Sequence, residues 1–308
     1  MKAGITITGP VATEEAAGVV RRPESAVGLR NRRWRSLGLH AILSVTALLF
    51  AFPVIWMVIS SFKSQDEVAS VPPTIFPKSW LLSNYSDAVH YIDFGRYTFN
   101  TALISSLVVV GTVFSCSVAA YALACIAWPG RNAVFALALS TMLLPYPVTI
   151  VPLFLIFRTL GWTGAHDWHT ILPLVVPAFG GNAFFIFLLR QFFRTIPRDL
   201  LEAARVDGAT YLTTFLRIIL PLSRPALSVV ALLAFLNTWT DFFAPLVYLN
   251  DPNWYTLSIG LQQYKSQHGV QVGLLMAASV LFVLPIVVLF FAAQKTFIRG
   301  ITMSGIKG

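Results

Sequence analysis

The sequence contains six long stretches in which charged residues are nearly absent. Five of them hold no Asp, Glu, Lys or Arg (36–62, 97–130, 132–157, 168–189 and 266–294), and the sixth, 225–250, holds Asp241. A helix needs about 20 mostly apolar residues to cross the hydrocarbon core of a bilayer. Charged residues make up 11% of the chain, against about 25% in a soluble domain. The pattern therefore predicts an all-α polytopic membrane protein with six transmembrane helices, at about 38–62, 97–127, 132–157, 169–190, 225–249 and 270–294.

The basic residues are distributed unevenly around these predicted spans. Seventeen of the 22 Lys and Arg residues fall before the first span, after the second, between the fourth and fifth, or after the sixth. Because cytoplasmic segments carry an excess of Lys and Arg, we expect both termini to be cytoplasmic. Residues 1–36 are then predicted to be a flexible basic cytoplasmic tail, and 37–308 a multi-pass membrane domain. This topology explains the net charge of +9 without nucleic-acid binding.

The segment 194–222, between the fourth and fifth predicted spans, has the pattern of two short helices joined by a turn. Pro197 suits the first turn of a helix, where its missing N–H leaves no hydrogen bond unmade. Asp199 and Glu202 follow in the early turns, near the positive end of the helix dipole. Gly208 readily adopts the left-handed conformation that ends a helix, and a second helix can then run as far as Pro221.

Within this segment, Glu202-Ala203-Ala204, three residues, Gly208, nine residues and Ile218-x-Leu220-Pro221 resemble the EAA loop of permease subunits in binding-protein-dependent ABC importers. The flanking residues are similar to the carbohydrate branch of that family, and most of all to its maltose-type second permease subunit. They are Arg190-Gln191-Phe192-Phe193, Asp207-Gly208-Ala209, Pro147–Pro152 and Trp239-Thr240-Asp241-Phe242. The similarity covers roughly residues 37–308. One departure is Thr240, where that branch more often has asparagine.

The resemblance implies a type I ABC importer transmembrane domain that lies in a bacterial or archaeal cell (inner) membrane and takes up a sugar. Its implied partners are a second homologous permease subunit, a cytoplasmic ABC ATPase dimer, an extracytoplasmic sugar-binding protein and the lipid bilayer. The loop is implied to dock on the ATPase and to carry its motion to the membrane helices. The residues implied in that coupling are Glu202, Ala203, Ala204, Arg205, Asp207 and Gly208.

The sequence has no Gly-x-x-x-x-Gly-Lys-Ser/Thr segment, the loop that cradles nucleotide phosphates in many ATPases. We therefore expect ATP and Mg²⁺ to be used by a partner ATPase, with no cofactor bound by this chain. The chain is expected to be a transporter subunit and not an enzyme.

A second group of candidate residues is polar and lies within the predicted spans. Asp241 is the one acid inside a span, and an intramembrane ionisable group is a functional candidate that should face the bundle interior. With Asn237, Trp239 and Thr240 it forms a patch that suits sugars, whose hydroxyls bond to amides and carboxylates and whose rings stack on indoles. Asn182 and Asn100 are further candidates for the substrate path.

Structural roles are the alternative for these path candidates. Asp241 would then pair with Asn100, Asn182 or a neighbouring subunit. The two glycines before Asn182 favour close helix packing, and Asn100 would make a contact at the entry of its helix.

Other functions compete with sugar import. An ABC importer permease for a non-sugar solute such as glycerol phosphate has the same kind of loop. An ion-coupled secondary carrier would normally show internal symmetry and more intramembrane ionisable groups, and a polytopic enzyme would need clustered His, Asp, Glu or Ser residues. Neither the two cysteines nor His166-Asp167-Trp168-His169 have the spacing of a metal site. The sequence therefore favours the permease.

Overall fold

The structure is a computed structural model that describes residues 26–266 and 269–304. The chain divides into two compact units, residues 1–53 and 54–308. Helix α1 (Ala26–Ser60) begins inside the segment 1–36 for which the sequence predicts a flexible tail. Residues 1–25 of that predicted tail lie outside the described part of the chain.

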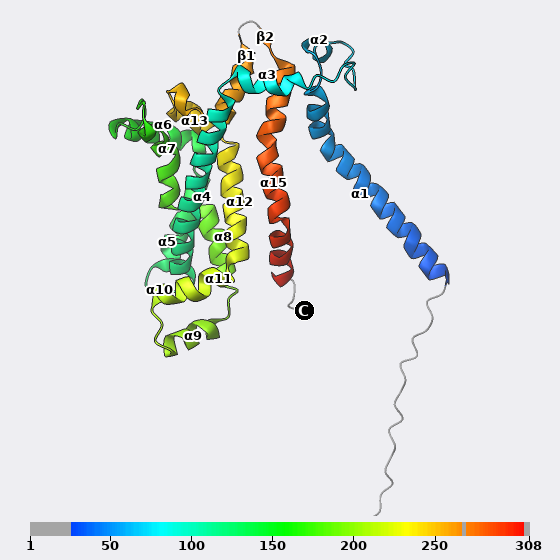
Figure 1. Ribbon diagram of the computed structural model, residues 1–308. Coiled ribbons are helices and arrows are strands. Elements are labelled where there is room, and N and C mark those ends of the chain that lie inside the picture. Colours follow the sequence, from blue (N-terminus) through cyan, green and yellow to red (C-terminus); the bar gives the residue numbers. More distant parts are fainter. Residues whose placement is uncertain (1–25, 267–268, 305–308) are drawn as a thin grey trace, which may run out of the picture. The chain divides into compact units, whose positions relative to one another are not determined.

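The second unit is built from helices and one antiparallel pair of two-residue strands (Figure 1). Its longest helices are α4 (Phe94–Ala124), α12 (Arg224–Trp239) and α15 (Val272–Ser304). The shorter α-helices are α2 (Gln65–Val68), α3 (Ser83–Tyr91), α5 (Arg131–Ser140), α6 (Tyr146–Thr159), α7 (Leu172–Val175), α8 (Ala183–Phe193), α9 (Arg198–Val206), α10 (Tyr211–Thr214), α11 (Leu220–Leu222), α13 (Phe243–Tyr248) and α14 (Leu257–Gly260). Short 3₁₀ and π-helical segments complete the second unit. The 3₁₀ segments are η1 (Thr141–Leu143), η2 (Trp168–Ile171), η3 (Val176–Gly180), η5 (Pro252–Trp254) and η6 (Leu261–Tyr264), and the π-helical segment is η4 (Phe215–Ile219).

The predicted helical class is confirmed, with the small exception of strands β1 (Lys265–Ser266) and β2 (Gly269–Val270). Among the described residues, four helical segments are long and apolar enough to cross a membrane: Gly38–Ser60, Phe94–Ala124, Trp168–Phe193 and Val272–Gln294. Two sharply bent helix pairs bring the number to six if each pair is counted as one span. The described segments therefore support between four and six spans.

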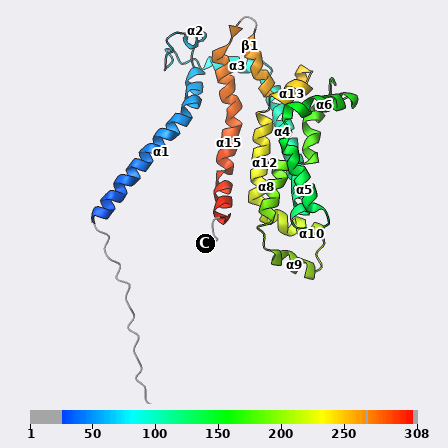
Figure 2. The same cartoon turned by 180° about the vertical axis from the view of Figure 1, so that it is seen from behind.

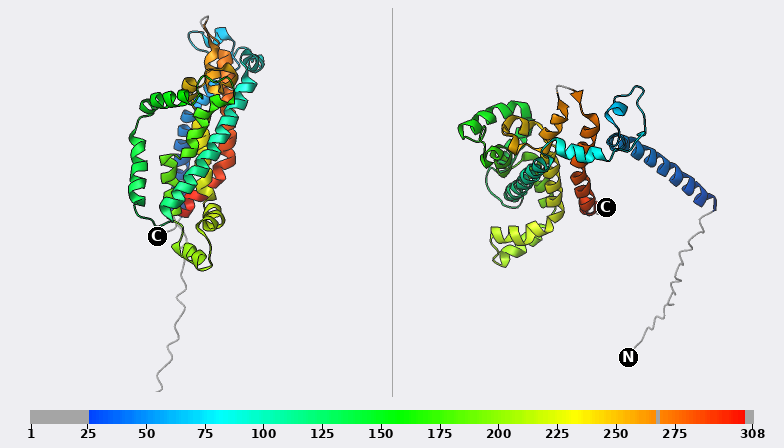
Figure 3. Two further views of the ribbon diagram at one scale, coloured as in Figure 1. Left: turned by 90° about the vertical axis from the view of Figure 1, so that its left-hand side faces the viewer. Right: turned by 45° about the horizontal axis from the view of Figure 1, so that its top comes forward.

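The predicted span 132–157 is not one straight helix. Arg131–Leu143 and Tyr146–Thr159 meet at 100°, and Figure 3 shows the green helices α5 and α6 turning this corner. Pro145 explains the corner because a proline ring disfavours the helical conformation of the residue before it. Leu144 accordingly has φ −78° and ψ 117°, an extended conformation.

The predicted spans 169–190 and 225–249 are also interrupted. In the first, Gly181 has φ +88° and separates η3 from α8. In the second, α12 ends at Trp239 and α13 begins at Phe243. A further bend of 78° separates Tyr211–Leu222 from α12. Hydropathy reports the length of an apolar run and does not show where the helix within it stops.

Helix α4 is the centre of the second unit. It packs against α8, η3 and α12, and α12 lies between α4 and α15 (Figures 1 and 2). The α4 residues in these contacts are mostly small: Ser105, Gly111, Thr112, Cys116, Ser117 and Ala120 are buried. Small side chains allow helix backbones to approach closely where no hydrophobic effect drives association. Larger side chains from α8 and α12, including Leu189, Phe193 and Val230, fill the core around them.

Two ends of this bundle differ in character. One end carries α9, α10 and α11 (Figures 1 and 2). The other is closed by α3, α14, η6 and the strand pair, which pack around a second apolar cluster that includes Ala88, Tyr97, Leu257 and Tyr264. Hydrogen bonds hold this closure: the Tyr264 hydroxyl donates to the carbonyl of Ala88 at 2.7 Å, and the Asn84 amide donates to two backbone carbonyls at 2.9 Å. Burial raises the pKa of the Tyr264 hydroxyl.

The contact between α14 and α4 leaves no room at Gly260. A Cβ atom there would lie 2.6 Å from the ring of Tyr97, which is buried and cannot swing away. We expect Gly260→Ala to reduce the free energy of unfolding by about 1–3 kcal/mol, the usual cost of overpacking. The measurement is the thermal midpoint of the purified protein in detergent. Gly95→Ala is the matched control, because a Cβ on Gly95 in the first turn of α4 meets nothing within 4 Å. Equal midpoints for the two variants would contradict this account of the contact.

Candidate functional site

Helix α9 begins and ends as the sequence predicts. Pro197 precedes its first residue with φ −56° and ψ 132°, and Asp199 lies in the first turn. Arg205 lies in the last turn, near the negative end of the helix dipole. In the nine-residue helix Arg198–Val206, Asp199 and Arg205 thus complement the dipole, whereas Arg198 at the first position opposes it.

Gly208 ends α9 in a Schellman motif. Its φ is +77°, and its N–H donates to the carbonyl of Arg205 at 3.0 Å. The N–H of Ala209 donates to the carbonyl of Ala204 at 2.9 Å, which completes the pair of bonds that define the motif. A side chain in this conformation costs about 1–2 kcal/mol because Cβ approaches the following carbonyl. This is the physical reason for a glycine six residues after Glu202.

The two faces of α9 are unlike. Ala204 is buried and Leu201 half-buried, so this face turns toward the bundle. Glu202, Ala203 and Asp207 are exposed, and the Val206 side chain is 88% exposed. Leu200 and Arg205 are exposed as well, so the solvent-facing residues of α9 and its cap include charged, small and apolar side chains.

The residues after α9 tie the loop to α4. Thr210 caps α10 by accepting the N–H of Thr213 at 3.1 Å. The Tyr121 hydroxyl, on α4, donates to the carbonyl of Tyr211 at 3.1 Å, and its ring lies 5.1 Å from that of Phe215. Arg205 approaches the ring of Tyr211 at 5.7 Å, a distance suited to a cation–π contact. These contacts join the segment after α9 to the central helix α4.

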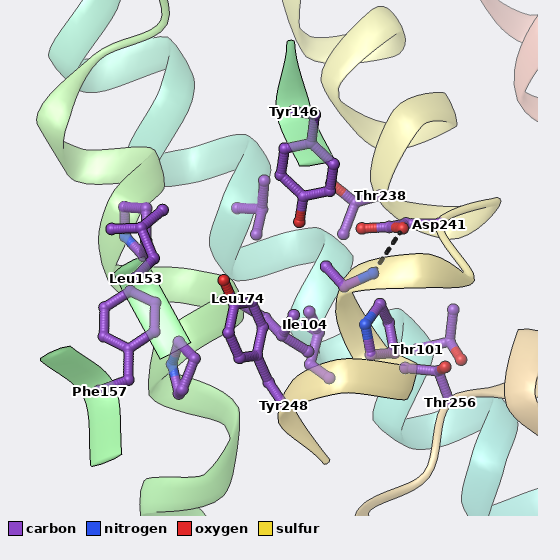
Figure 4. Close-up of a pocket in the computed structure, with 15 residues that line it drawn as sticks. Thr101, Ile104, Tyr146, Leu153, Phe157, Leu174, Thr238, Asp241, Tyr248 and Thr256 are labelled. Carbon is purple, nitrogen blue, oxygen red and sulfur yellow. Dashed lines mark hydrogen bonds between the residues drawn. The ribbon is translucent and has the colours of Figure 1, made fainter. Parts of the chain in front are cut away.

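A separate cavity of about 180 Å³ lies within the bundle, nearer the other end (Figure 4). Its polar groups come from three regions of sequence: Thr101 on α4, Tyr146 at the start of α6, and Thr238, Asp241, Tyr248 and Thr256 from the α12–α14 region. Its apolar walls include Ile104, Leu153, Phe157 and Leu174. Figure 4 shows Tyr146, Tyr248 and Asp241 around the same space. Hydroxyls, one carboxylate and aromatic rings suit a hydroxylated solute.

Asp241 caps a helix that begins inside the bundle. Its Oδ1 accepts the N–H groups of Phe243 and Ala244, at 3.0 and 3.2 Å. These N–H groups belong to the first turn of α13 and have no carbonyl partner within that helix. The carboxylate therefore has a structural task as well as a place in the cavity wall. The expected pairing of Asp241 with Asn100 or Asn182 is not present among the described hydrogen bonds and was wrong, but the cap gives Asp241 a structural role of another kind. Pairing with a neighbouring subunit stays a prediction.

Asn182 and Asn237 lie together in a second cavity, of about 340 Å³. This cavity shares Val108, Pro177 and Thr238 with the first, so the two adjoin. Asn182 also caps α8, accepting the N–H groups of Phe184 and Phe185 at 3.0 and 3.3 Å. The structure thus brings three of the predicted path residues, Asn182, Asn237 and Asp241, to adjoining cavities.

The other three predicted path residues lie elsewhere. Trp239 is buried, and its indole N–H donates to the carbonyl of Phe282 on α15 at 3.0 Å, so stacking on a sugar in either cavity is a wrong expectation. Asn100 is buried and donates to the carbonyls of Asn253 and Tyr255, which fixes the segment before α14. Thr240 is exposed, lines neither cavity, and its hydroxyl donates to the carbonyl of Leu236 at 2.8 Å.

Sequence reasoning missed Tyr146, Tyr248, Thr101 and Thr256 as cavity residues. Tyrosine and threonine are unremarkable in an apolar run, and these four come from segments far apart in the chain. The one available signal was Pro145, which ends the preceding helix and places Tyr146 at the first position of α6.

The segment His166–His169 is a capped turn. Asp167 accepts the N–H and the ring Nδ1 of His169 at 3.1 and 2.7 Å, and the bond from the His169 ring holds the pKa of Asp167 below its ordinary value. His166 Nδ1 lies 3.6 Å from the carboxylate of Asp251, whose pKa is lowered chiefly by the N–H of Asn253. Within the described ranges, no three His, Cys, Asp or Glu residues are placed to hold a metal ion.

A bundle of bent membrane helices that presents a short capped helix at one end defines a class of transport protein, the ABC importer permease. Residues 111–303 match the model of the family described as binding-protein-dependent transport system inner membrane component. The chain belongs to this family, and it is therefore a non-catalytic permease subunit of the multi-pass membrane type.

Relatives of the chain include carbohydrate permeases. It is 33% identical to the arabinooligosaccharides transport system permease protein AraQ of Bacillus subtilis (strain 168), over 88% of this chain and 96% of that protein. It is 31% identical to the sn-glycerol-3-phosphate transport system permease protein UgpE of Yersinia enterocolitica, over 90% of this chain and 99% of that protein. A crystal structure of a bacterial ABC transporter involved in the import of the acidic polysaccharide alginate contains a chain that superposes with a TM-score of 0.74 at 25% identity, over 87% of this chain and 98% of that one.

Two substitutions test whether Asp241, besides lining the cavity, caps α13. Asp241→Asn keeps an oxygen acceptor for the N–H groups of Phe243 and Ala244, whereas Asp241→Ala removes it. We expect the alanine variant to lose about 1 kcal/mol of stability, the usual effect of losing a cap, and the asparagine variant to unfold close to the wild type. The measurement is the thermal midpoint in detergent, with Thr240→Ala as the control. Equal losses for both Asp241 variants would rule out the cap.

Proposed function

We propose that this chain is one of two permease subunits of an ATP-driven, binding-protein-dependent sugar importer. The observation that carries the proposal is α9, a capped helix with an exposed face, held at one end of a membrane bundle. The family of the chain and the names of its relatives support the same function.

The coupling step follows from the contacts of the loop. We propose that an ABC ATPase dimer in the cytoplasm covers the outward face of α9, where Glu202, Ala203 and Asp207 are exposed. Carboxylates at the rim of such an interface form charged contacts, while Ala203 and Val206 permit close apolar contact. Movement of the ATPase then reaches α4 through Tyr211, Phe215 and Tyr121. ATP and Mg²⁺ are held by the ATPase, not by this chain.

The translocation path is proposed to use the adjoining cavities. Asn182, Asn237, Thr238 and Asp241 offer hydrogen bonds to solute hydroxyls, and Tyr146 adds a ring and a hydroxyl. A cavity of about 180 Å³ is smaller than a typical ligand pocket of about 300–1,000 Å³. A second permease subunit is therefore proposed to complete the path, and an extracytoplasmic sugar-binding protein to deliver the solute.

The proposed topology has six spans with both termini in the cytoplasm. It counts the bent pair Arg131–Leu143 and Tyr146–Thr159 as one span and α12 with α13 as another, and it places α9, α10 and α11 in the cytoplasm with the arginines around them. Excess Lys and Arg on the cytoplasmic side is the physical basis of this orientation.

Import of glycerol phosphate is the second candidate function. It is favoured by the 31% identity to a glycerol-3-phosphate permease, which is close to the 33% identity to an arabinooligosaccharide permease. Identity at this level does not separate the two solutes. The test uses a deletion strain with and without the restored chain. Its uptake of radiolabelled arabinooligosaccharide and of radiolabelled glycerol 3-phosphate separates the two solutes.

Coupling through α9 predicts the effect of a charge reversal. Glu202→Lys places a cation where the interface has a carboxylate and removes a charge-assisted hydrogen bond worth about 1.5–3 kcal/mol. We expect co-purification of the ATPase to weaken by about ten- to hundredfold, and ATP-driven solute uptake to fall with it. Asp66→Lys, the same charge change on exposed α2, is the control and should leave both unchanged. Normal uptake by Glu202→Lys at normal expression would contradict the coupling role.

The Schellman motif generates a second prediction. Gly208→Leu forces a side chain into a left-handed conformation and costs about 1–2 kcal/mol at the end of α9. We expect ATP-driven uptake to fall while the chain still reaches the membrane, because the change is confined to the loop.

Gly161→Leu is the matched control for Gly208→Leu. Gly161 has φ +72°, a Cβ there also meets nothing within 4 Å, and the residue lies after α6 and far along the chain from α9. The backbone cost is the same and the coupling loop is untouched. Equal losses of uptake in the two variants would show that strain in general, and not the shape of α9, causes the defect.

A further inference from the structure

A cavity of about 290 Å³ lies beside α9 and is lined by four arginines. Arg131 is the first residue of α5, Arg194 follows α8, and Arg198 and Arg205 stand at the two ends of α9. Apolar side chains from α4 and α8 complete the wall. Four guanidinium groups from the ends of three helices thus line one space.

Their charge is not neutralised by the described structure. Glu202 is the one carboxylate that lines the cavity. The ion pairs found among residues with described side chains involve Asp93, Asp167 and Asp251, so no described carboxylate lies within 4.0 Å of these guanidinium groups. The cavity therefore carries an excess of three positive charges over Glu202. Like charges close together repel, and an anion placed among them relieves the repulsion.

Two of the four arginines already have partners. Arg131 donates to the carbonyl of Ile126 at 3.2 Å, and Arg205 lies over the ring of Tyr211. Within the described part of the chain, the side chains of Arg194 and Arg198 make no hydrogen bond and no ion pair. Nearby Arg190 has a structural role outside the cavity: it donates to the carbonyl of Leu123 at 3.2 Å and lies 3.9 Å from the ring centroid of Phe135. The donors of Arg194 and Arg198 are free to bind a ligand.

We propose that this cavity binds a phosphate group, carried by an anionic lipid headgroup or present as a free phosphate ion. The planar guanidinium group matches phosphate oxygens with two parallel hydrogen bonds. Basic pockets between membrane helices on the cytoplasmic side are known sites for phosphorylated headgroups. The proposal rests on the cytoplasmic placement of α9 given above. The α4–α5 and α8–α9 connections meet here, where membrane helices give way to the loop.

A neighbouring cavity of about 330 Å³ is suited to the rest of a headgroup. It shares Cys125, Leu201 and Arg205 with the arginine cavity and adds Thr210 and Thr214. Threonine hydroxyls match the hydroxyls of a glycerol headgroup. These dimensions fit a headgroup better than a folded segment of protein. An acidic segment of a partner protein is the competing occupant, and the experiment below separates the two.

The experiment measures ligand binding to the purified full chain, without its partners and without transport. The probes are nanodiscs of phosphatidylcholine with or without phosphatidylglycerol, and inorganic phosphate alone. Bound phosphatidylglycerol is counted by native mass spectrometry after release from the nanodisc, and affinity is taken from a titration of thermal stability. We expect Arg194→Gln/Arg198→Gln to weaken the arginine-dependent binding by about 25-fold, at about fivefold for each arginine removed.

Arg217→Gln/Arg224→Gln is the matched control. Both residues are exposed, Arg217 in η4 and Arg224 at the start of α12, neither lines the cavity, and the double variant loses the same charge. A second double variant, Arg194→Lys/Arg198→Lys, keeps the charge and controls for misfolding. We expect it to retain most of the binding.

Each outcome has a stated meaning. Loss of phosphatidylglycerol binding in the cavity pair but not in the control supports a headgroup site. The same pattern with inorganic phosphate alone, competing with the lipid, supports the site with free phosphate as its ligand. Equal losses in the two glutamine pairs would overturn the proposal in favour of diffuse surface charge. Binding of neither probe would overturn it in favour of a protein occupant. None of these results depends on uptake, so failure of the proposed transport function would be seen separately.

Discussion

Broken helices in this bundle impose one requirement on the rest of the structure. The first turn of a helix has N–H groups without intrahelical partners, and in an apolar environment each unsatisfied group costs several kcal/mol. Asn182 meets that requirement for α8, and Asp241 meets it for α13. The helices can therefore stop and restart within apolar stretches, which allows them to enclose cavities that straight helices would fill. The polar residues that line the cavities are partly the same ones that make the breaks tolerable.

Much of the fold followed from local rules. Charge-free runs identified the helical membrane class, and Pro197, Asp199 and Gly208 predicted α9 to within a residue or two because caps depend on near neighbours. The breaks inside the predicted spans did not follow, since hydropathy averages over the positions where Leu144, Gly181 and Thr240 interrupt the helices. Tyr146 could not be assigned to a cavity for a different reason, because its neighbours there come from α4 and the α12–α14 region.

The candidate path residues show how chemistry alone misleads. Trp239 and Asp241 are two positions apart, and both suited a sugar. One residue is directed at α15 and the other at a cavity, because α12 ends between them. Asn100 has a suitable amide group, but its side-chain NH₂ donates to the carbonyls of Asn253 and Tyr255. Which polar residue is available to a solute depends on which backbone groups need a partner first, and that is a property of the folded chain.

The exposed side chain of Val206 has a consequence for the cell. Val206 is 88% exposed and Leu200, on the same helix, is 44% exposed, so α9 presents apolar surface to solvent. Leu212, 66% exposed, extends the apolar surface beyond the turn. If an ATPase covers this face as proposed above, a subunit made in excess of its partners would leave the apolar surface in water, where proteases and chaperones can bind it. Balanced synthesis of the subunits would then matter for the amount of this chain that accumulates, independently of any effect on transport itself.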